Sequence, residues 1–433
     1  MHLMGTSRLN TFVTPKPHAG LIRTLIPFNR LVNLKGIPLL RDIPYLNRLP
    51  IIRGLCDIRE IDLDDASKAL LAHAMNGKTA SFITPNHPEF FTDWMLDKEI
   101  ASRFYPLTAN WATHSIVNGM GKWGQKFWLA NHLIAQVPGD TESALTYSKQ
   151  AAAHGTPVLL HPEGQVLWQS DYINPLFHGA AQMALELARE RPEKTVLIQP
   201  VVWKLRFTRN VSRELMQELA YVEQQLGLPQ QPHLALPLRL AKVHRDVLKQ
   251  TFTYLGYIAP KGLNYFDLRD ALLNRINQDL QHRFGMFTGD TEEQSRQLLR
   301  AIRQDEKQGK PLDTMTVRKR RELQRLLRTP KAAYSAERWS QENIAECIKR
   351  LRNDYLKKGW RNALHHFVPR PVAGRIAHIR ACEAIDIQAL LKRQPNITAD
   401  AIMNEVRLSM QMALDGLKQQ FPATQTYANP FLL

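Results

Sequence analysis

The middle of the chain alternates short apolar runs with longer stretches in which apolar residues recur every three or four positions. The runs at residues 80–84, 156–160 and 195–204 predict strands, and the stretches at 141–153 and 175–189 predict helices. Strands that alternate with helices in this way are typical of an α/β fold. We therefore predict a mixed, mostly parallel sheet that is flanked by helices.

The segments on either side of this core have different patterns. Helical periodicity and clustered basic residues dominate the region that follows the core, which predicts a basic helical insertion or lobe. An alternating segment at 374–380 then predicts a strand, and residues 399–419 predict a closing helix. We divide the chain into an N-terminal arm (1–55), an α/β core (56–209), the helical insertion (210–365) and a C-terminal strand and helix that complete the core (366–433).

The predicted strand at 195–204 contains Pro200. Proline cannot donate a ladder hydrogen bond, and within sheets it is confined to edge strands, strand starts and bulges. The sequence therefore predicts that this strand lies at an edge of the sheet, or that it carries a bulge near a site.

The N-terminal arm is basic and partly apolar. Its first fifty residues contain one acid, Asp42, and seven basic residues, which are Arg8, Lys16, Arg23, Arg30, Lys35, Arg41 and Arg48. Apolar residues lie between them at helix-like spacing at Leu21, Leu25, Phe28 and Val32, but Pro27 and Pro38 predict that the helices are short. Two interpretations remain open: an interfacial arm on an anionic membrane, or an arm packed along the protein's own surface.

Composition narrows the class of protein. The 433 residues and the hydrophobic fraction of 44% allow a sizeable core, and the formal net charge of +17 attracts anionic lipids, phosphorylated molecules or nucleic acid. Three scattered cysteines predict neither a disulfide framework nor a structural zinc site, in keeping with a reducing compartment. With no signal peptide and no membrane-spanning run expected, we predict a cytoplasmic protein that associates peripherally with a membrane.

The first candidate for catalytic chemistry directly follows the predicted strand at 80–84. The sequence Asn86-His87-Pro88 begins a predicted helix, since proline suits a first helical turn, and Asp93 falls on its second turn. A histidine can take a proton from a hydroxyl group when a carboxylate orients its ring. We interpret His87 as a general base and Asp93 as its orienting carboxylate, although a lone histidine at a strand end is more often structural.

A second polar segment, HPEG at 161–164, directly follows the predicted strand at 156–160. A Pro-Glu-Gly turn at a strand exit aims a carboxylate above the sheet, where open α/β sheets bind ligands; the alternative is a turn whose glutamate caps the next segment. Two further segments follow in order, FHGAA at 177–181 and IQPVV at 198–202. Each of these two, taken alone, is more often part of a core than of a site.

Taken in order, the segments NHP-x4-D, PEG, FxxGA and an apolar strand with proline resemble the boxes of the 1-acylglycerol-3-phosphate acyltransferase family. The resemblance covers roughly residues 75–208, and residues 374–387 are similar to a later strand of that family that ends in an E-x-I segment. It implies a glycerolipid acyltransferase-like fold, with the segment at 56–209 as the acyltransferase core. The order of several boxes, rather than any single one, makes the resemblance specific.

The resemblance also implies a reaction and its site. A fatty acyl chain would pass from the thioester of acyl-CoA or acyl-carrier protein to a hydroxyl of a lysophospholipid or related glycerolipid, at an anionic membrane surface. His87 would be the general base and Asp93 its partner, and Asn86, Glu163 and Gly164 would bind the acceptor. No metal and no cofactor are expected beside the acyl thioester, which is a co-substrate.

Three features depart from the family's pattern. Five residues, rather than the commonest four, separate the histidine from the aspartate; the box at 161–166 reads HPEGQV without an arginine; and the segment at 133–140 contains no arginine. Arginines are natural bidentate partners of phosphate, so the acceptor stays open. Arg103, Lys122 and Lys126 are candidates to replace them.

Other functions remain open at this point. The basic helical insertion contains Tyr334, Trp339, Tyr355 and Trp360 near its Arg/Lys clusters, a composition suited to nucleic acid, but no recognised motif accompanies them and no nucleic-acid partner is expected. A catalytically degenerate lipid-binding or scaffold protein would account for the missing arginines, whereas the presence of both members of the histidine–aspartate pair favours an enzyme.

A metal hydrolase is the remaining alternative. His87, Asp93, His161 and Glu163 would have to converge on one ion, and the chain lacks the HExxH-like spacing that supports such a site.

Overall fold

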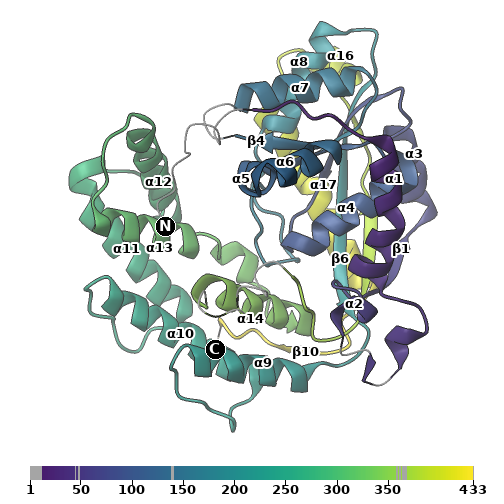
Figure 1. Ribbon diagram of the computed structural model, residues 1–433. Coiled ribbons are helices and arrows are strands. Elements are labelled where there is room, and N and C mark those ends of the chain that lie inside the picture. Colours follow the sequence, from purple (N-terminus) through teal and green to yellow (C-terminus); the bar gives the residue numbers. More distant parts are fainter. Residues whose placement is uncertain are drawn as a thin grey trace. The chain divides into compact units, whose positions relative to one another are not determined.

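The computed structural model describes residues 12–43, 45–46, 49–137, 141–356, 359, 362 and 368–432. The chain folds into two compact units, whose elements are labelled in Figure 1. The first, the sheet unit, comprises Met1–Val166, Ser170–Thr208 and Phe367–Pro422. The second, the helical unit, comprises Leu167–Gln169, Arg209–His366 and Ala423–Leu433.

Within the described residues, the sheet unit is built on eight strands in the spatial order β1-β8-β6-β2-β5-β3-β4, with β9 also beside β6. Five neighbouring strands from β6 to β4 are parallel, whereas β8 and β9 run antiparallel to β6, and β1 is parallel to β8. The predicted α/β class, with a mixed and mostly parallel sheet, is therefore confirmed. The strands are β1 (Ile58–Leu63), β2 (Ala80–Pro85), β3 (Ala109–Thr113), β4 (Leu133–Gln136), β5 (Val158–Leu159), β6 (Val196–Phe207), β8 (Arg375–Ala381) and β9 (Ile385–Asp386).

Helices cover both faces of this sheet (Figure 1). On β6, Ile198 and Val202 belong to the cluster formed with α7, α8, α16 and α17. Val201 and Trp203 belong to the cluster formed with η1, α3 and α4. Successive side chains of a strand point to opposite faces, so a strand that is covered on both sides reads as one continuous apolar run.

The helices that the sequence predicted for the sheet unit are present. The elements of this unit are α1 (Ala19–Phe28), η1 (Asn29–Lys35), η2 (Leu40–Asp42), α2 (Pro50–Arg53), α3 (Asp65–Ala74), α4 (Phe90–Phe104), α5 (His114–Gly119), α6 (Gly121–Ala130), α7 (Thr141–Ala153), α8 (Gly179–Glu190), α16 (Ile387–Arg393) and α17 (Ala399–Gln420). Of the predicted helices, α8 begins clearly later than expected. The backbone N–H groups of Asn174 and Phe177 donate to Glu163 and to the carbonyl of Pro162, which keeps this segment outside the helix.

Pro200 does not mark an edge strand, so the first of its two predicted alternatives is wrong. β6 lies inside the sheet, between β2 on one side and β8 and β9 on the other. Its pairing with β8 ends at Val201 and its pairing with β9 begins at Ile198. The neighbouring backbone is thus interrupted opposite Pro200, where a missing N–H group is tolerated.

Pro27 likewise does not end the helix of the N-terminal arm. α1 continues without a break into η1, a π-helix that ends before Gly36. π-Helical turns accommodate a local loss of the regular hydrogen-bond ladder, which the proline causes. Gly36 adopts φ +74°, and a Cβ atom there would lie 2.3 Å from the carbonyl oxygen of Ile52, so only glycine fits this turn.

One face of the arm packs on the protein itself. Leu34 of η1 is fully buried, Asn29 Nδ2 donates to the carbonyl of Met95 on α4 at 3.2 Å, and Arg30 Nε contacts Glu99 of α4 at 2.8 Å. The interpretation that the arm packs along the protein's own surface therefore holds for this face, and the arm is attached directly to α4.

The helical unit is assembled around aromatic side chains. Tyr265, Tyr334 and Trp339 surround Phe431, with ring centroids 4.5, 5.1 and 5.2 Å from that ring. The elements of this unit are α9 (Ser212–Gln225), α10 (Leu236–Tyr254), α11 (Tyr265–Phe284), α12 (Thr291–Lys307), α13 (Thr314–Leu326), η4 (Lys331–Tyr334), β7 (Arg338–Ser340), α14 (Gln341–Tyr355) and β10 (Thr426–Ala428). Because Tyr334 and Trp339 are buried, neither ring is available to stack on a nucleic-acid base; Trp360 lies outside the described residues.

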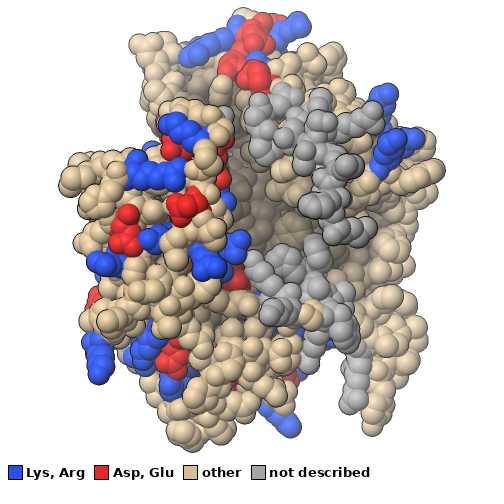
Figure 2. All heavy atoms as spheres, turned by 60° about the vertical axis from the view of Figure 1, so that its left-hand side comes forward, with Lys and Arg blue, Asp and Glu red and all other residues tan. Residues whose placement is uncertain are grey.

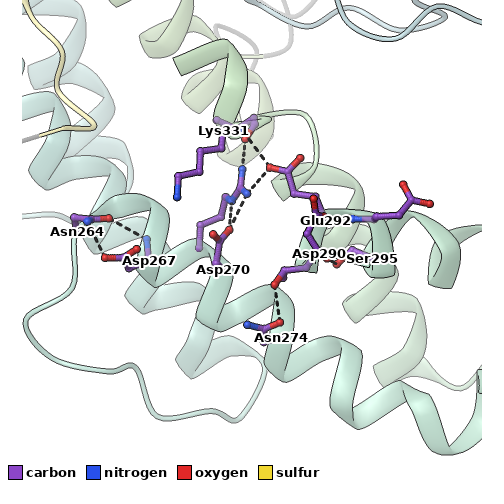
Figure 3. A network of polar contacts seen from close by, with 12 residues as sticks. Asn264, Asp267, Asp270, Asn274, Asp290, Glu292, Ser295 and Lys331 are labelled. Atoms are coloured by element: carbon purple, nitrogen blue, oxygen red, sulfur yellow. Dashed lines mark hydrogen bonds and ion pairs between the residues drawn. The ribbon is translucent and has the colours of Figure 1, made fainter. Parts of the chain in front are cut away.

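The basic residues of the helical unit are extensively paired with acids. Figure 3 shows one such network, in which Arg269 contacts Asp270 of α11 and Glu292 of α12 at 2.7 and 2.5 Å. Within the predicted basic cluster at 318–321, Lys319 contacts Asp279 at 2.7 Å. Acidic and basic side chains are also interspersed over the face in Figure 2. This pairing disfavours the uniformly positive surface that a phosphate backbone would need.

Candidate active site

The candidate site forms where β2 and β5, which are neighbours in the sheet, reach their carboxyl ends. β2 ends at Pro85 and leads directly to His87, and β5 ends at Leu159 and leads to His161 and Glu163. Parallel neighbours deliver their following residues to the same edge of a sheet, which is where open α/β sheets bind ligands. The two segments that the sequence singled out separately are therefore brought together.

His87 is oriented by Asp93, as the sequence predicted for their geometry. The ring nitrogen Nδ1 of His87 lies 2.9 Å from Oδ2 of the buried Asp93. Asp93 lies in the first turn of α4 and not in the predicted second turn, because the helix begins at Phe90 and Pro88 precedes it. The Oδ2 atom of Asp93 also accepts the backbone N–H of Glu89 at 2.7 Å, and Oδ1 accepts the indole N–H of Trp203 at 2.9 Å. Both carboxylate oxygens thus face N–H donors, and we assign the proton of the neutral His87 ring to Nδ1.

The other ring nitrogen of His87, Nε2, carries a lone pair when the proton is on Nδ1. Among the described residues, no hydrogen bond is formed with Nε2, and the side chain is 15% exposed. Burial, together with the neighbouring His161 ring, holds the pKa of His87 well below its ordinary value. His87 is therefore a neutral imidazole near pH 7, with a lone pair available at Nε2.

Asp93 is subject to two opposing influences. Burial raises the pKa of Asp93 well above its ordinary value, while the N–H groups of Glu89 and Trp203 favour the ionised carboxylate. A carboxylate that is held in this way orients the histidine ring and stabilises the imidazolium that forms when Nε2 takes a proton.

A second histidine–aspartate pair lies against the first, and it was not predicted from the sequence. His161 Nε2 lies 2.9 Å from Oδ2 of Asp97, and His161 Nδ1 lies 3.0 Å from the carbonyl oxygen of Asn86. The rings of His161 and His87 stack with their centroids 4.1 Å apart and their planes inclined by 18°. Asp97 follows Asp93 by four residues, so one face of α4 supplies both carboxylates; that spacing is the signal that could have revealed the pair.

Glu163 is buried and bonded within the protein. Its Oε1 accepts the backbone N–H of His87 at 2.8 Å, and its Oε2 accepts the N–H of Asn174 at 3.3 Å. Burial raises the pKa of Glu163 to about 7. The carboxylate therefore fixes the backbone at His87 and ties the turn after β5 to the turn after β2.

The predicted acceptor residue Asn86 also has partners inside the fold. Its side-chain amide donates to the carbonyl of Trp203 at 3.1 Å and accepts the N–H of Trp203 at 3.0 Å. This pair of bonds continues the register of β2 and β6 beyond Pro85 and leaves Asn86 only 2% exposed. The Asn86 side chain therefore attaches the backbone directly before His87 to β6.

Gly164 is the exposed member of the predicted acceptor set. It adopts φ +67°, and a Cβ atom at this position would lie 2.4 Å from the ring of Phe177, which is itself 64% exposed. A side chain here would displace that ring, so glycine permits the turn and the close approach of Phe177. The exposed ring of Phe177 therefore forms an apolar surface beside the turn after β5.

A buried arginine supports the start of α4 from the far end of the chain. Arg375 of β8 contacts Glu89 at 2.8 Å, and it donates to Thr92 Oγ1 at 3.2 Å and to the carbonyl of Cys56 at 2.9 Å. Its charge is neutralised by Glu89, so it orients the helix start rather than presenting a free cation. This contact was not predicted, because 286 positions separate Arg375 from Glu89.

The three cations considered as replacements for the missing arginines lie on α4 and α6. Arg103 lies thirteen residues after Phe90 on α4, about 20 Å along the helix from the end that carries Asp93, and it is paired with Glu99 at 3.0 Å. Lys126 of α6 lies over the ring of Trp123. Arg103 therefore does not reach the site.

No group of three or more His, Cys, Asp and Glu side chains that could hold a metal ion occurs in the described part of the chain. His87, Asp93, His161 and Glu163 do converge, but they bond to one another and to backbone groups.

None of the described helices is long and apolar enough to span a membrane. Neither a protein-family model nor a curated protein matches the chain. We therefore infer the function from the geometry of the site.

A Glu163→Gln variant tests the electrostatics of this site through stability. Because the pKa of the carboxyl is raised by folding, wild-type Glu163 costs progressively more stability as the pH rises from its unfolded value towards 7. Between pH 4.5 and 8, the free energy of unfolding of the wild type should therefore fall by up to about 3 kcal/mol more than that of the variant. Unfolding by urea across that range measures it; an unchanged slope would mean that the carboxyl titrates normally.

Proposed function

We propose that this protein is an O-acyltransferase that moves a fatty acyl chain from an acyl-CoA or acyl-carrier protein thioester to a hydroxyl of a lysophospholipid or related glycerolipid. The proposal includes a glycerolipid acyltransferase-like fold for the sheet unit. Its main support is one observation: His87 has Nδ1 engaged by Asp93 while Nε2 has no partner among the described residues. That arrangement is what a general base requires.

The reaction would proceed with the acceptor hydroxyl as nucleophile. His87 Nε2 takes the hydroxyl proton as the oxygen attacks the thioester carbonyl carbon, and Asp93 stabilises the resulting imidazolium. The tetrahedral intermediate then expels the thiolate, which recovers the proton from Nε2. An ester bond forms, a thioester bond breaks, and His87 returns to its neutral state.

Asn86 and Glu163 would contribute by positioning. Both are buried and bonded to the backbone around His87, so they hold the ring in place rather than contact the acceptor. Gly164 and Phe177 remain as the exposed residues at the turn after β5, suited to contact an apolar chain. No cofactor takes part in this scheme; the acyl thioester is a co-substrate.

Thiol release tests the proposal whichever acceptor the protein uses. Purified protein would be incubated with acyl-CoA, or with acyl-carrier protein, and with lysophosphatidate, other lysophospholipids, glycerol 3-phosphate or no acceptor. We expect thiol release that depends on one acceptor class. Release that is equal with and without every acceptor would indicate a thioesterase, and no release with either donor would favour the lipid-binding or scaffold alternative.

We further propose that the N-terminal arm is the part that binds an anionic membrane. The segment after η1 exposes a group of four large apolar side chains, Leu39, Tyr45, Leu49 and Ile51, which are 83%, 75%, 53% and 58% exposed. The arm around it is basic, and apolar side chains surrounded by Arg and Lys suit the headgroup region. These four residues belong to the same unit as His87, and η1, which precedes them, packs on α4.

A Leu39→Glu/Tyr45→Glu variant tests this membrane proposal. Each apolar side chain that enters the interface should strengthen binding about tenfold, so the double variant should bind anionic vesicles about a hundredfold more weakly. Ile258→Glu is the matched control, because Ile258 of the helical unit is 94% exposed. Vesicle sedimentation measures both; equal losses in the two variants, or none, would assign the membrane contact elsewhere.

A further inference from the structure

The hydrogen bonds of His161 define its protonation state. Nδ1 faces a backbone carbonyl, that of Asn86 at 3.0 Å, which can only accept. Nε2 faces a carboxylate oxygen of Asp97 at 2.9 Å, and this aspartate is 2% exposed. A neutral imidazole has one N–H group and can satisfy only one of these acceptors as a donor. Two acceptors on two ring nitrogens therefore favour the imidazolium form.

Most of the polar groups that surround His161 favour its protonated form. Asp97 on α4 and Glu163 in its own turn are acidic, and both raise the pKa of His161 against the effect of burial. The indole ring of Trp203 on β6 lies edge-on at 6.0 Å. The His87 ring is also a neighbour, with its centroid 4.1 Å from that of His161. Lys98 is a cation that interacts with Asp97.

From this geometry we infer that His161, held as an imidazolium by Asp97, is a positioning residue that keeps the stacked His87 ring neutral down to acidic pH. A second positive charge on His87 would lie about 4 Å from the first and be repelled by it. The inference rests on the proposed function in one respect only: neutral His87 is useful because it must accept a proton. It extends that function by giving the site an acid tolerance that a lone histidine–aspartate pair would lack.

The size of the effect follows from the separation. Two unit charges 4 Å apart repel by an amount equivalent to about one to three pKa units, for effective dielectric constants between those of water and a protein surface. Loss of the His161 charge should raise the pKa of His87 by this amount. Since the base is active when neutral, the acid limb of the pH–rate profile should move to higher pH by the same number of units.

Two variants remove this charge in different ways. In Asp97→Asn, His161 loses its carboxylate and can be neutral while still donating to Asn86. In His161→Phe/Asp97→Leu, both charges are replaced by apolar side chains, an exchange that buried ion pairs usually tolerate. The double variant is needed because His161→Phe alone would leave Asp97 buried without its partner. Asp62→Asn is the matched control, since Asp62 forms the pair with His378, whose ring nitrogen is 2.8 Å away.

The test is a pH titration of the ring nitrogens by NMR on the full-length protein with ¹⁵N-labelled histidine, together with the pH–rate profile. We expect both nitrogens of His161 to carry protons at pH 7 in the wild type. The His87 titration should shift upward in both variants but not in Asp62→Asn, by at most about one to three units, because the opposing charge of Asp97 is lost with that of His161. A neutral His161, or an unshifted His87, would overturn the inference even if acyl transfer were observed. A shifted His87 in a protein without acyl transfer would overturn the proposed function and leave the inference intact.

Discussion

Replacement of Asp93 by asparagine should reduce acyl transfer by about 10³- to 10⁴-fold without unfolding the protein. The wild-type carboxylate accepts three N–H groups, from Glu89, Trp203 and His87. An asparagine has one oxygen and one NH₂ group, so its NH₂ group must face at least one former donor. If it faces His87, Nδ1 must accept, the ring proton moves to Nε2, and the lone pair that serves as the base disappears.

The measurement is kcat/KM for Asp93→Asn relative to wild type, with thermal unfolding as a check on the fold. Asp62→Asn makes the same chemical change at the His378 pair in the same unit, and it should retain wild-type turnover. A similar fall in both variants would point to a general structural effect. Full activity in Asp93→Asn would remove Asp93 from the mechanism.

A His87→Ala variant should lose about 10²- to 10⁴-fold in turnover, which is the usual contribution of a general base. Its stability should change little, because Asp93 keeps the hydrogen bonds from Glu89 and Trp203 and the missing ring is partly exposed. The expected result is therefore a folded protein that binds its substrates and turns them over slowly.

His154→Ala provides the control for this substitution. His154 is an exposed histidine of the sheet unit whose ring bonds only to the carbonyl of Gln150, at 2.7 Å, among the residues described. It should retain full turnover. If His87→Ala were as active as His154→Ala, another residue would have to supply the base, and the assignment of His87 would be wrong.

The parts of the fold that the sequence predicted well are those set by local pattern. Apolar runs defined β2 and β6, and helical periodicity with clear end signals placed α7 and α17 within a residue or two of their observed bounds. Pro27 and the edge-strand alternative for Pro200 were misjudged, because the effect of a proline depends on its context. One is absorbed by a change of helix type, and the other lies opposite a break in the neighbouring strand.

The site was predicted in part for a related reason. The spacing of His87 and Asp93 on one strand–helix junction is a local signal, and the structure brings their side chains within hydrogen-bond distance. The contact of His161 with Asp97, like that of Arg375 with Glu89, spans 64 or more positions and depends on which strands are neighbours in the sheet. Strand order is a tertiary property that periodicity does not specify.

The most direct test of the central claim is to follow labelled acyl groups from donor to lipid. Wild-type protein would be incubated on anionic vesicles that contain a panel of lysophospholipids, with labelled acyl-CoA in one series and labelled acyl-carrier protein in the other, beside His87→Ala. We predict labelled ester product with at least one acceptor and a loss of about 10²-fold or more in the variant. No product with any acceptor and either donor, or equal product from wild type and variant, would contradict the claim.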